Sequence, residues 1–230
     1  MSKKQKIVRA GHVVAAFDKP SIANGAVAVV NDRIEAIGAY DDLRSRWPDA
    51  EVIGGEDHLL IPGLINGHGH GRGLTDFQRG ALDNTLESWL FDTRKYVPVA
   101  TYDDLALSAI RLLKSGVTTT MHNHLLKHPA EWEQEFQEGL SAYRDAGMRV
   151  QFNPGVRNSN PFVYGDNEGF LKSLPENLRQ MLTAPPPEGA LTGENFVEAV
   201  KHLHAASDSD MTRIGFGPPE KKRGKAAALA

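Results

Sequence analysis

The chain has 230 residues, of which 40% are hydrophobic, so it can bury a sizeable core in one large domain or two smaller ones. Its formal net charge of −3 gives no compositional support for binding nucleic acid or an anionic membrane surface, and we expect neither partner. There is no cysteine, which excludes disulfides and thiolate metal ligands and leaves nitrogen and oxygen donors, including nine histidines. No segment approaches the roughly 20 apolar residues of a membrane-spanning helix, and no signal-like apolar segment follows the basic start, so we expect a cytoplasmic protein.

The N-terminal part of the chain has the pattern of a small β domain. Turn-forming residues such as Asn24-Gly25 separate short apolar runs. These runs predict strands over residues 7–17, 26–30, 34–38 and 51–53. We therefore assign residues 1–58 to an N-terminal β segment.

Two histidines one residue apart end the next apolar run. A strand is predicted over residues 59–66, and His68 and His70 follow it among glycines. On an extended strand, residues i and i+2 project from the same face, so the two imidazoles can converge on one ion. Because neutral imidazole is the commonest protein ligand of zinc, His68 and His70 are the predicted metal ligands. Two histidines do not complete a zinc shell, which leaves a mobile glycine and histidine loop as the alternative.

Strand and helix patterns alternate after Pro62, which is typical of parallel βα units. Thr101 and Asp104 approximate a capping box at the start of one predicted helix. Further strands are predicted over residues 117–121, 148–153 and 212–216, and the helices between them include 103–114 and 130–146.

These patterns predict an α/β fold. About four βα units of a TIM-type (β/α)8 barrel are expected over residues 59–217, preceded by the small β-sandwich segment. Residues 218–230 form a polar, alanine-rich tail without a strand pattern.

Polar side chains follow the predicted barrel strands. His122 and His124 follow the second strand, Asn153 and Arg157 follow the third, and Gln78 lies shortly after the histidine motif. Because active sites of such barrels form at the carboxyl ends of the strands, we predict that these residues contact substrate. Structural or solvent-facing loop roles are the alternative for all of them, and a second metal pair is a further alternative for His122 and His124.

Several motifs resemble those of the amidohydrolase superfamily. The sequence PGLINGHGH at residues 62–70 is similar to the first metal motif of that superfamily. Residues 79–80 (RG), 86–90 (LESWL) and 115–120 (SGVTTT) repeat the order of landmarks in its cytosine deaminase, guanine deaminase and triazine hydrolase branch. The resemblance extends over about residues 7–217 and implies the N-terminal half of a metal-dependent hydrolase.

The resemblance also implies what the rest of the site would contain. In the family, the N-terminal β segment joins a C-terminal segment in one β-sandwich. Later strands supply a third metal histidine, an acid/base glutamate, another histidine and a metal-bound aspartate. None of these positions can be matched in this sequence, so the catalytic residues are unknown and a truncated chain is expected. The implied cofactor is a divalent metal, zinc with iron as the alternative, and the implied substrate is a small nitrogen heterocycle.

Three functions remain open from the sequence. The first is a metal-dependent hydrolase that acts on C–N bonds other than peptide bonds. It would deaminate an aminated heterocycle, or hydrolyse a cyclic amidine or amide, with a metal-activated water. The second is a non-catalytic fragment or partner-dependent binding module, because an open half-barrel exposes strand edges and an apolar interior that favour association, including homo-oligomers. The third is a small-molecule binding or phosphate-handling α/β protein that uses Gly67 to Gly73 as a backbone cradle, against which the histidines and the absence of a P-loop lysine count.

Overall fold

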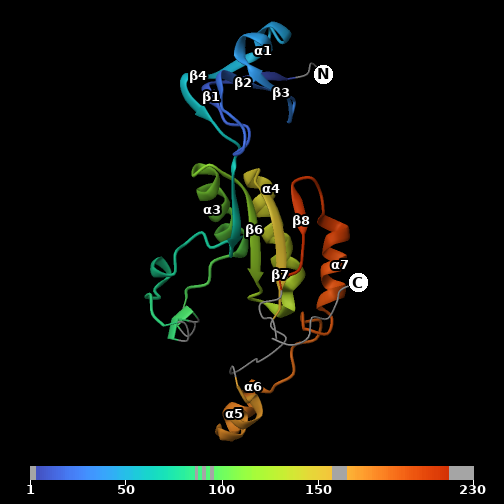
Figure 1. Ribbon diagram of the computed structural model, residues 1–230. Helices are drawn as coiled ribbons and strands as arrows, with labels where there is room; N and C mark the ends of the chain where they lie inside the picture. Colours follow the sequence, from blue (N-terminus) through green and yellow to red (C-terminus); the bar gives the residue numbers. More distant parts are fainter. Residues whose placement is uncertain (1–3, 86–87, 90–91, 94–95, 157–164, 218–230) are drawn as a thin grey trace. The chain divides into compact units, whose positions relative to one another are not determined.

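The computed structural model describes residues 4–85, 88–89, 92–93, 96–156 and 165–217. The chain divides into two compact units, Met1–Gly63 and Leu64–Ala230 (Figure 1). Each unit has its own sheet and its own buried core. The predicted substrate residue Arg157 and the tail at 218–230 lie outside the described residues.

The first unit is a four-stranded sheet with one helix. The strand order is β3-β2-β1-β4, in which β1 and β4 are parallel and the other neighbours are antiparallel. Its elements are β1 (Gln5–Val13), β2 (Ile22–Val30), β3 (Arg33–Ala39), α1 (Tyr40–Arg46) and β4 (Glu51–Leu60). Leu43 of α1 forms one buried cluster with Ile7 and Ala28 of the sheet. Each strand range predicted for the N-terminal segment overlaps one of these strands, although the bounds differ.

The single strand predicted over residues 59–66 is wrong, because two strands share that apolar run. Leu59 and Leu60 end β4, where they pair with His12 and Val13 of β1. A new strand, β5 (Leu64–Gly69), begins only after Pro62. Proline has no backbone N–H to donate to a ladder and fixes its own φ, so it separates the two strands.

The second unit is a parallel sheet with helices packed on it. The strand order is β5-β6-β7-β8, and each neighbouring pair is parallel. In chain order after β5, the main elements are α3 (Thr101–Lys114), β6 (Val117–Leu125), α4 (Trp132–Ala146), β7 (Arg149–Gly155), α7 (Phe196–Ser207) and β8 (Thr212–Ile214). Helices α3, α4 and α7 contact β6, β7 and β8 respectively (Figure 1). This is the predicted α/β arrangement of successive βα units.

Short helices lie in the connections of the second unit. They are η1 (Phe77–Arg79), η3 (Pro129–Glu131), α5 (Asn167–Ser173) and α6 (Glu176–Leu182). None of the helices in the described part of the chain is both long and apolar enough to cross a membrane.

The core of the second unit lies between the sheet and the helices. Leu105 of α3, Phe136 of α4, and Val150 and Phe152 of β7 belong to it. Val150 and Phe152 project from the same face because they are two residues apart, and the exposed Gln151 between them projects from the other. The sheet therefore has one face covered by helices, here called the helix face, and one called the open face.

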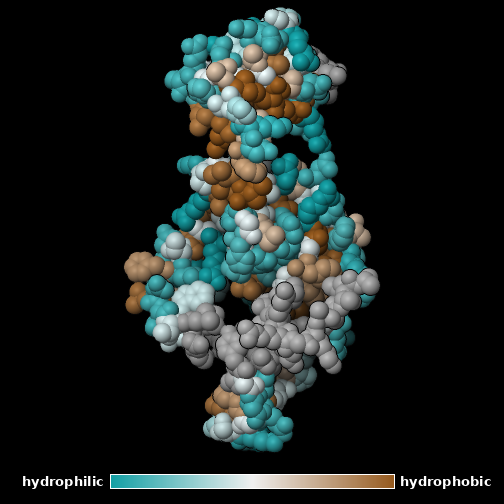
Figure 2. All heavy atoms as spheres, viewed as in Figure 1, coloured by the Kyte–Doolittle hydropathy of each residue, from teal (hydrophilic) through white to brown (hydrophobic). Residues whose placement is uncertain are grey.

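The open face is partly apolar. Ile65 of β5 is 74% exposed. Apolar residues reach the surface in both units (Figure 2). A sheet that leaves one apolar face uncovered is what a partial barrel is expected to present.

Candidate metal centre

The strand end that carries the two histidines departs from regular pairing. Asn66 pairs with Thr120 of β6 and Gly69 pairs with His122, so β5 has one more residue than β6 between these two pairs. The side-chain Oδ1 of Asn66 accepts a hydrogen bond from the backbone N–H of His68 at 3.2 Å. Because such a bulge re-aims the side chains on either side of it, Asn66 and His68 need not share a face.

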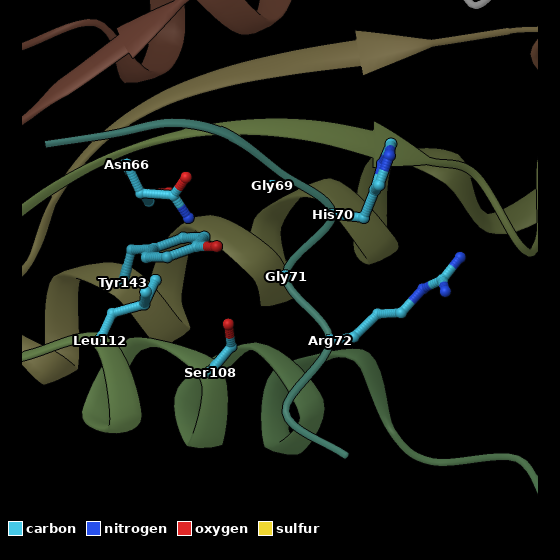
Figure 3. Close-up of a pocket in the computed structure, with 9 residues that line it drawn as sticks. Asn66, Gly69, His70, Gly71, Arg72, Ser108, Leu112 and Tyr143 are labelled. Carbon is cyan, nitrogen blue, oxygen red and sulfur yellow. The ribbon is translucent and has the colours of Figure 1, made fainter. Parts of the chain in front are cut away.

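Asn66 faces the helices, whereas the second histidine does not. Asn66 lines a pocket with Ser108 and Tyr143 of the two covering helices. Figure 3 shows these side chains directed into the pocket, while His70 and Arg72 point away from it. His70 is still among the residues that line this pocket, so the pocket adjoins the histidine motif.

The two predicted metal ligands lie side by side next to β6. The ring centroids of His68 and His70 are 5.0 Å apart, and the ring planes are at 89°. Asn123 of β6 contacts both: His70 Nδ1–H donates to its carbonyl oxygen at 2.8 Å, and its side-chain Nδ2 lies 3.1 Å from His68 Nδ1. Both histidines are exposed, so a ligand can reach them from solvent.

This donor set fits part of a zinc site. A catalytic zinc commonly takes three protein ligands and keeps one position open. Within the described ranges, no group of three or more His, Cys, Asp or Glu side chains is arranged to hold a metal. His68 and His70 therefore offer two nitrogen ligands, and a complete shell needs further ligands.

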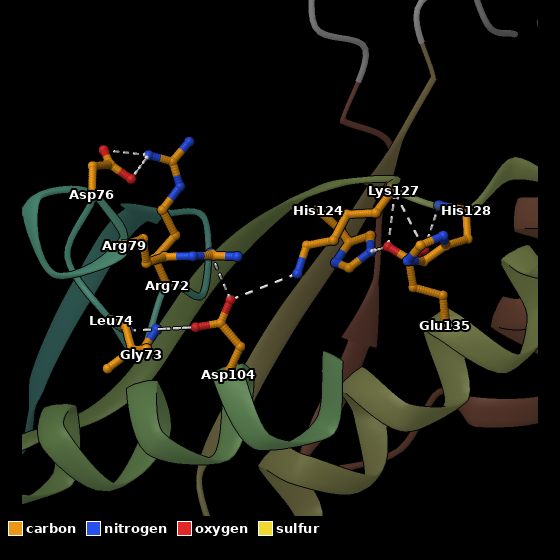
Figure 4. Close-up of polar contacts among 10 residues, drawn as sticks. All are labelled: Arg72, Gly73, Leu74, Asp76, Arg79, Asp104, His124, Lys127, His128 and Glu135. Atoms are coloured by element: carbon orange, nitrogen blue, oxygen red, sulfur yellow. Dashed lines mark hydrogen bonds and ion pairs between the residues drawn. The ribbon is translucent and has the colours of Figure 1, made fainter. Parts of the chain in front are cut away.

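Buried polar contacts fix the loop after β5 to helix α3. Asp104 Oδ1 accepts a hydrogen bond from the Gly73 N–H at 2.8 Å. Asp104 Oδ2 lies 3.3 Å from the Arg79 guanidinium and 3.6 Å from Lys127 Nζ (Figure 4). One carboxylate thus holds two points of the connection after β5, Gly73 and Arg79, and also contacts Lys127 in the loop after β6.

We expect Gly71→Ala to lower the free energy of unfolding by about 2 kcal/mol and Gly80→Ala by about 1 kcal/mol. Both glycines have left-handed φ angles, +63° at Gly71 and +94° at Gly80, so alanine is strained at either position. A Cβ at Gly71 would also overlap the buried His122 ring, whereas a Cβ at Gly80 meets nothing within 4 Å. Urea denaturation of the two variants separates the effect of the overlap with His122 from the effect of backbone strain. An equal loss of unfolding free energy in both variants would contradict the overlap.

His122 and His124 lie on the helix face of β6. His122 Nδ1 is 2.8 Å from the Tyr143 hydroxyl, and His124 Nε2–H donates to Glu135 Oε1 at 2.7 Å. Both rings pack against Phe152. Burial above all, and then the neighbouring His124, lower the pKa of His122 well below 6.5, which keeps this imidazole neutral at pH 7.

His122 is enclosed against α4, whereas the buried His124 is among the residues that line the pocket beside His70. The i,i+2 spacing indicates that two residues share a face, but it does not indicate which face. Here Asn123, between them, takes the open face instead. Their substrate contact stays a prediction, and their burial favours the structural alternative.

Asn153 and Gln78 occupy different surroundings. Asn153 Nδ2 donates to Asn123 Oδ1 at 3.2 Å, which places Asn153 one hydrogen bond away from the residue that joins the histidine pair. Gln78 Oε1 accepts from the Thr75 N–H at 3.0 Å and from the Thr75 hydroxyl at 3.2 Å. Gln78 therefore closes its own turn, and its substrate contact also stays a prediction.

Sequence reasoning missed Asn123, Asp104 and Glu135. For Asn123 a signal existed, because strand alternation sends it to the face opposite His122 and His124. Glu135 and Asp104 act through contacts between different elements, as Figure 4 shows for their bonds to the loops. No local spacing in the sequence indicates those contacts.

The pocket beside the second histidine has cations, but they are paired. Its lining includes Arg72, Arg79 and Lys127. Arg72 pairs with Asp76 at 2.8 Å, and the other two share Asp104. Three cations therefore share two carboxylates, which leaves this group with one positive charge in excess.

Comparison with known proteins gives relatives in sequence. A family model described as "Imidazolonepropionase-like composite domain, bacteria" matches residues 25–50. The 5-methylthioadenosine/S-adenosylhomocysteine deaminase 1 of Syntrophus aciditrophicus (strain SB) is 31% identical over 134 residues, which are 56% of this chain and 28% of that protein.

Solved structures give relatives in fold. A mutant of atrazine chlorohydrolase from Arthrobacter aurescens TC1, complexed with zinc and atraton, matches with a TM-score of 0.66 and 20% identity over 94% of this chain and 48% of that chain. Guanine deaminase from C. acetobutylicum, with guanine bound in its active site, matches with a TM-score of 0.59 and 13% identity over 93% of this chain and 46% of that chain. The chain thus spans less than half the length of each of these three proteins.

These matches confirm the predicted fold class and the resemblance noted from the histidine motif. The sequence relative is a deaminase, and the fold relatives are a chlorohydrolase and a deaminase. The chain is thus similar in sequence to a deaminase and in fold to a chlorohydrolase and a guanine deaminase, and it matches a part of the length of each.

Proposed function

We propose that the chain forms part of a metal-dependent hydrolase that removes ammonia from a small aminated nitrogen heterocycle. The observation that carries this proposal is the His68 and His70 pair, with ring centroids 5.0 Å apart at the carboxyl end of the first strand of the parallel sheet. Functional sites of βα barrels form at this end of the strands.

The proposed cofactor is a divalent metal, zinc with iron as the alternative. When bound, such a cation lowers the pKa of a coordinated water toward neutrality and supplies hydroxide as the nucleophile. His68 and His70 would hold the cation through nitrogen, while Asp104 keeps the following loop in place. Among the described residues no third ligand joins these two histidines, so the proposal places the remaining ligands and the group that transfers the proton to the leaving ammonia outside the described residues.

The proposed substrate is small, aromatic and nitrogen-rich. The relatives are named for methylthioadenosine, adenosylhomocysteine, guanine and atrazine, which supports an aminated purine or triazine.

We expect purified protein to bind zinc stoichiometrically and the His68→Ala/His70→Ala variant to lose it. The matched control is His202→Ala/His204→Ala, a second pair with the same spacing on helix α7, where both residues are exposed. Two residues apart on a helix project in different directions, so this control should retain the metal. Elemental analysis after dialysis measures the metal content, and equal loss from both variants would contradict the proposed ligands.

Ammonia release from a panel of adenosine derivatives, guanine and aminated triazines tests the reaction. The expected result is release that depends on added zinc and disappears in His68→Ala/His70→Ala. Bound metal without ammonia from any substrate would favour the alternative of a non-catalytic or partner-dependent module.

A further inference from the structure

We propose that Asn123 is the positioning residue of this centre, because it sets which ring nitrogen of both histidines carries the proton. The inference rests on the proposed metal-binding role of His68 and His70. A histidine binds a metal through a nitrogen without a proton, and the hydrogen bond at its other nitrogen decides which one that is.

On His70 the Asn123 backbone fixes the outcome. The carbonyl oxygen of Asn123 lies 2.8 Å from His70 Nδ1. Because a carbonyl only accepts hydrogen bonds, Nδ1 must carry the proton. The Nε2 atom of His70 then has a free lone pair for a metal, whatever side chain stands at position 123.

On His68 the Asn123 side chain decides, and its amide can take two orientations. With Nδ2 at 3.1 Å from His68 Nδ1, the amide donates, and the proton of the neutral ring is left on Nε2. With the amide reversed, Oδ1 accepts from Nδ1–H and Nε2 is free. The heavy atoms occupy nearly the same positions in both orientations, so the hydrogen-bond network chooses between them.

That network continues over the open face through two more amides. Asn153 Nδ2 lies 3.2 Å from Asn123 Oδ1, and Gln151 Nε2 lies 3.3 Å from Asn153 Oδ1. If the side-chain amides of Asn123, Asn153 and Gln151 are all turned by about 180°, each hydrogen bond is kept but its donor and acceptor are exchanged. The hydrogen-bond series can therefore run in two directions, and each direction leaves the proton of His68 on a different ring nitrogen. In the proposed metal-binding direction His68 Nδ1–H donates to Asn123, Asn123 donates to Asn153, and Asn153 donates to Gln151.

The middle amide is held in place. Asn153 is buried, with only 4% exposure, and a Cβ at Gly215 would overlap its Oδ1 atom. Gly215, directly after β8, leaves room for this amide only because it has no Cβ, so Asn153 is closely confined beside Asn123. Because the Asn153 amide is confined, its orientation and that of the Asn123 amide depend on each other through their hydrogen bond.

Three variants test the proposal. Asn123→Leu removes the amide but keeps the backbone carbonyl for His70. Asn123→Asp presents only acceptors, so it should hold the proton on His68 Nδ1. Met121→Leu is the control on the same face of β6, because it conserves volume and changes no hydrogen bond.

The measurements are zinc affinity by competition with a chelating indicator and the 15N chemical shifts of the imidazole nitrogens in metal-free protein. Asn123→Leu should weaken zinc binding by about 10- to 100-fold. Asn123→Asp should bind at least as tightly as the wild type and show His68 protonated on Nδ1, and Met121→Leu should stay within about twofold of the wild type. Thermal unfolding of each variant confirms that it is folded.

Two results would overturn the inference and separate it from the proposed function. If Asn123→Leu binds zinc as tightly as the wild type while His68→Ala/His70→Ala loses it, the result supports the metal ligands and contradicts the positioning role of Asn123. If the metal-free Asn123→Asp protein keeps the proton of His68 on Nε2, the positioning role falls whether or not zinc binds.

Discussion

Asp104→Ala is expected to lower the free energy of unfolding by about 3–5 kcal/mol, because it removes one partner of a buried ion pair. Asp104 is 2% exposed and Arg79 is 8% exposed at the side chain. Without the carboxylate, the Arg79 guanidinium would remain buried without its counter-charge, and the Gly73 N–H would lose its acceptor at 2.8 Å.

The neighbouring Asp103→Ala is the matched control. Both aspartates lie in the first turn of α3, but Asp103 is exposed. Its loss should cost at most about 1 kcal/mol through the helix dipole. Urea denaturation at pH 7 measures both variants, and Asp104→Asn should fall between them because its amide oxygen can still accept from Gly73. Equal losses for Asp103→Ala and Asp104→Ala would contradict the anchoring role of Asp104.

The role of Asp104 also marks where local sequence rules fail. Thr101 and Asp104 have the spacing of a capping box, but the prediction is wrong. The cap of α3 is Ala100, with no side-chain hydrogen bond. The Asp104 carboxylate bonds instead to Gly73, 31 residues earlier in the chain, and the preference for this long-range contact over a local cap is set by tertiary packing.

Elements defined by a long periodic pattern could be predicted. Apolar residues at helical spacing predict a helix over 130–146, and α4 runs from Trp132 to Ala146 before Gly147 with φ +73°. The alternation of strands and helices likewise predicts the parallel sheet, since parallel strands need long crossovers. The pairing of His68 with His70 follows from strand geometry in the same way.

Choices between equivalent local patterns could not be predicted. The apolar run alone does not reveal that β4 ends at Leu60 and β5 begins at Leu64, and the signal for that break is Pro62 between them. Alternation places His122 and His124 on a common face, but only the packing of helix α4 decides that this face is buried. The same packing of α4 places Asn123 on the opposite face, where it contacts both His68 and His70.

Glu135→Gln is expected to cost about 3 kcal/mol of unfolding free energy at pH 7. Glu135 and His124 are each 2% exposed at the side chain and lie 2.7 Å apart. The carboxylate also accepts from the Lys127 N–H at 3.0 Å and from the His128 N–H at 2.8 Å (Figure 4). A glutamine keeps one acceptor oxygen, but its NH2 group then faces at least one of these N–H donors and cannot accept from it.

This loss should depend on pH. Burial raises the pKa of Glu135, but the hydrogen bonds from His124 and from the Lys127 and His128 amides together lower it further, so the pKa lies below its ordinary value of 4.5. A lowered pKa in the folded state means that the carboxylate contributes its full stability above pH 4.5 and loses it as the pH falls through the lower folded value. The difference between wild type and Glu135→Gln should therefore be constant near neutrality and shrink below pH 4.5. Chemical denaturation across this range measures it, with the exposed Glu133→Gln on the same helix as control. A difference that stays constant into acid would mean that the ionised form of Glu135 does not hold the loop to α4.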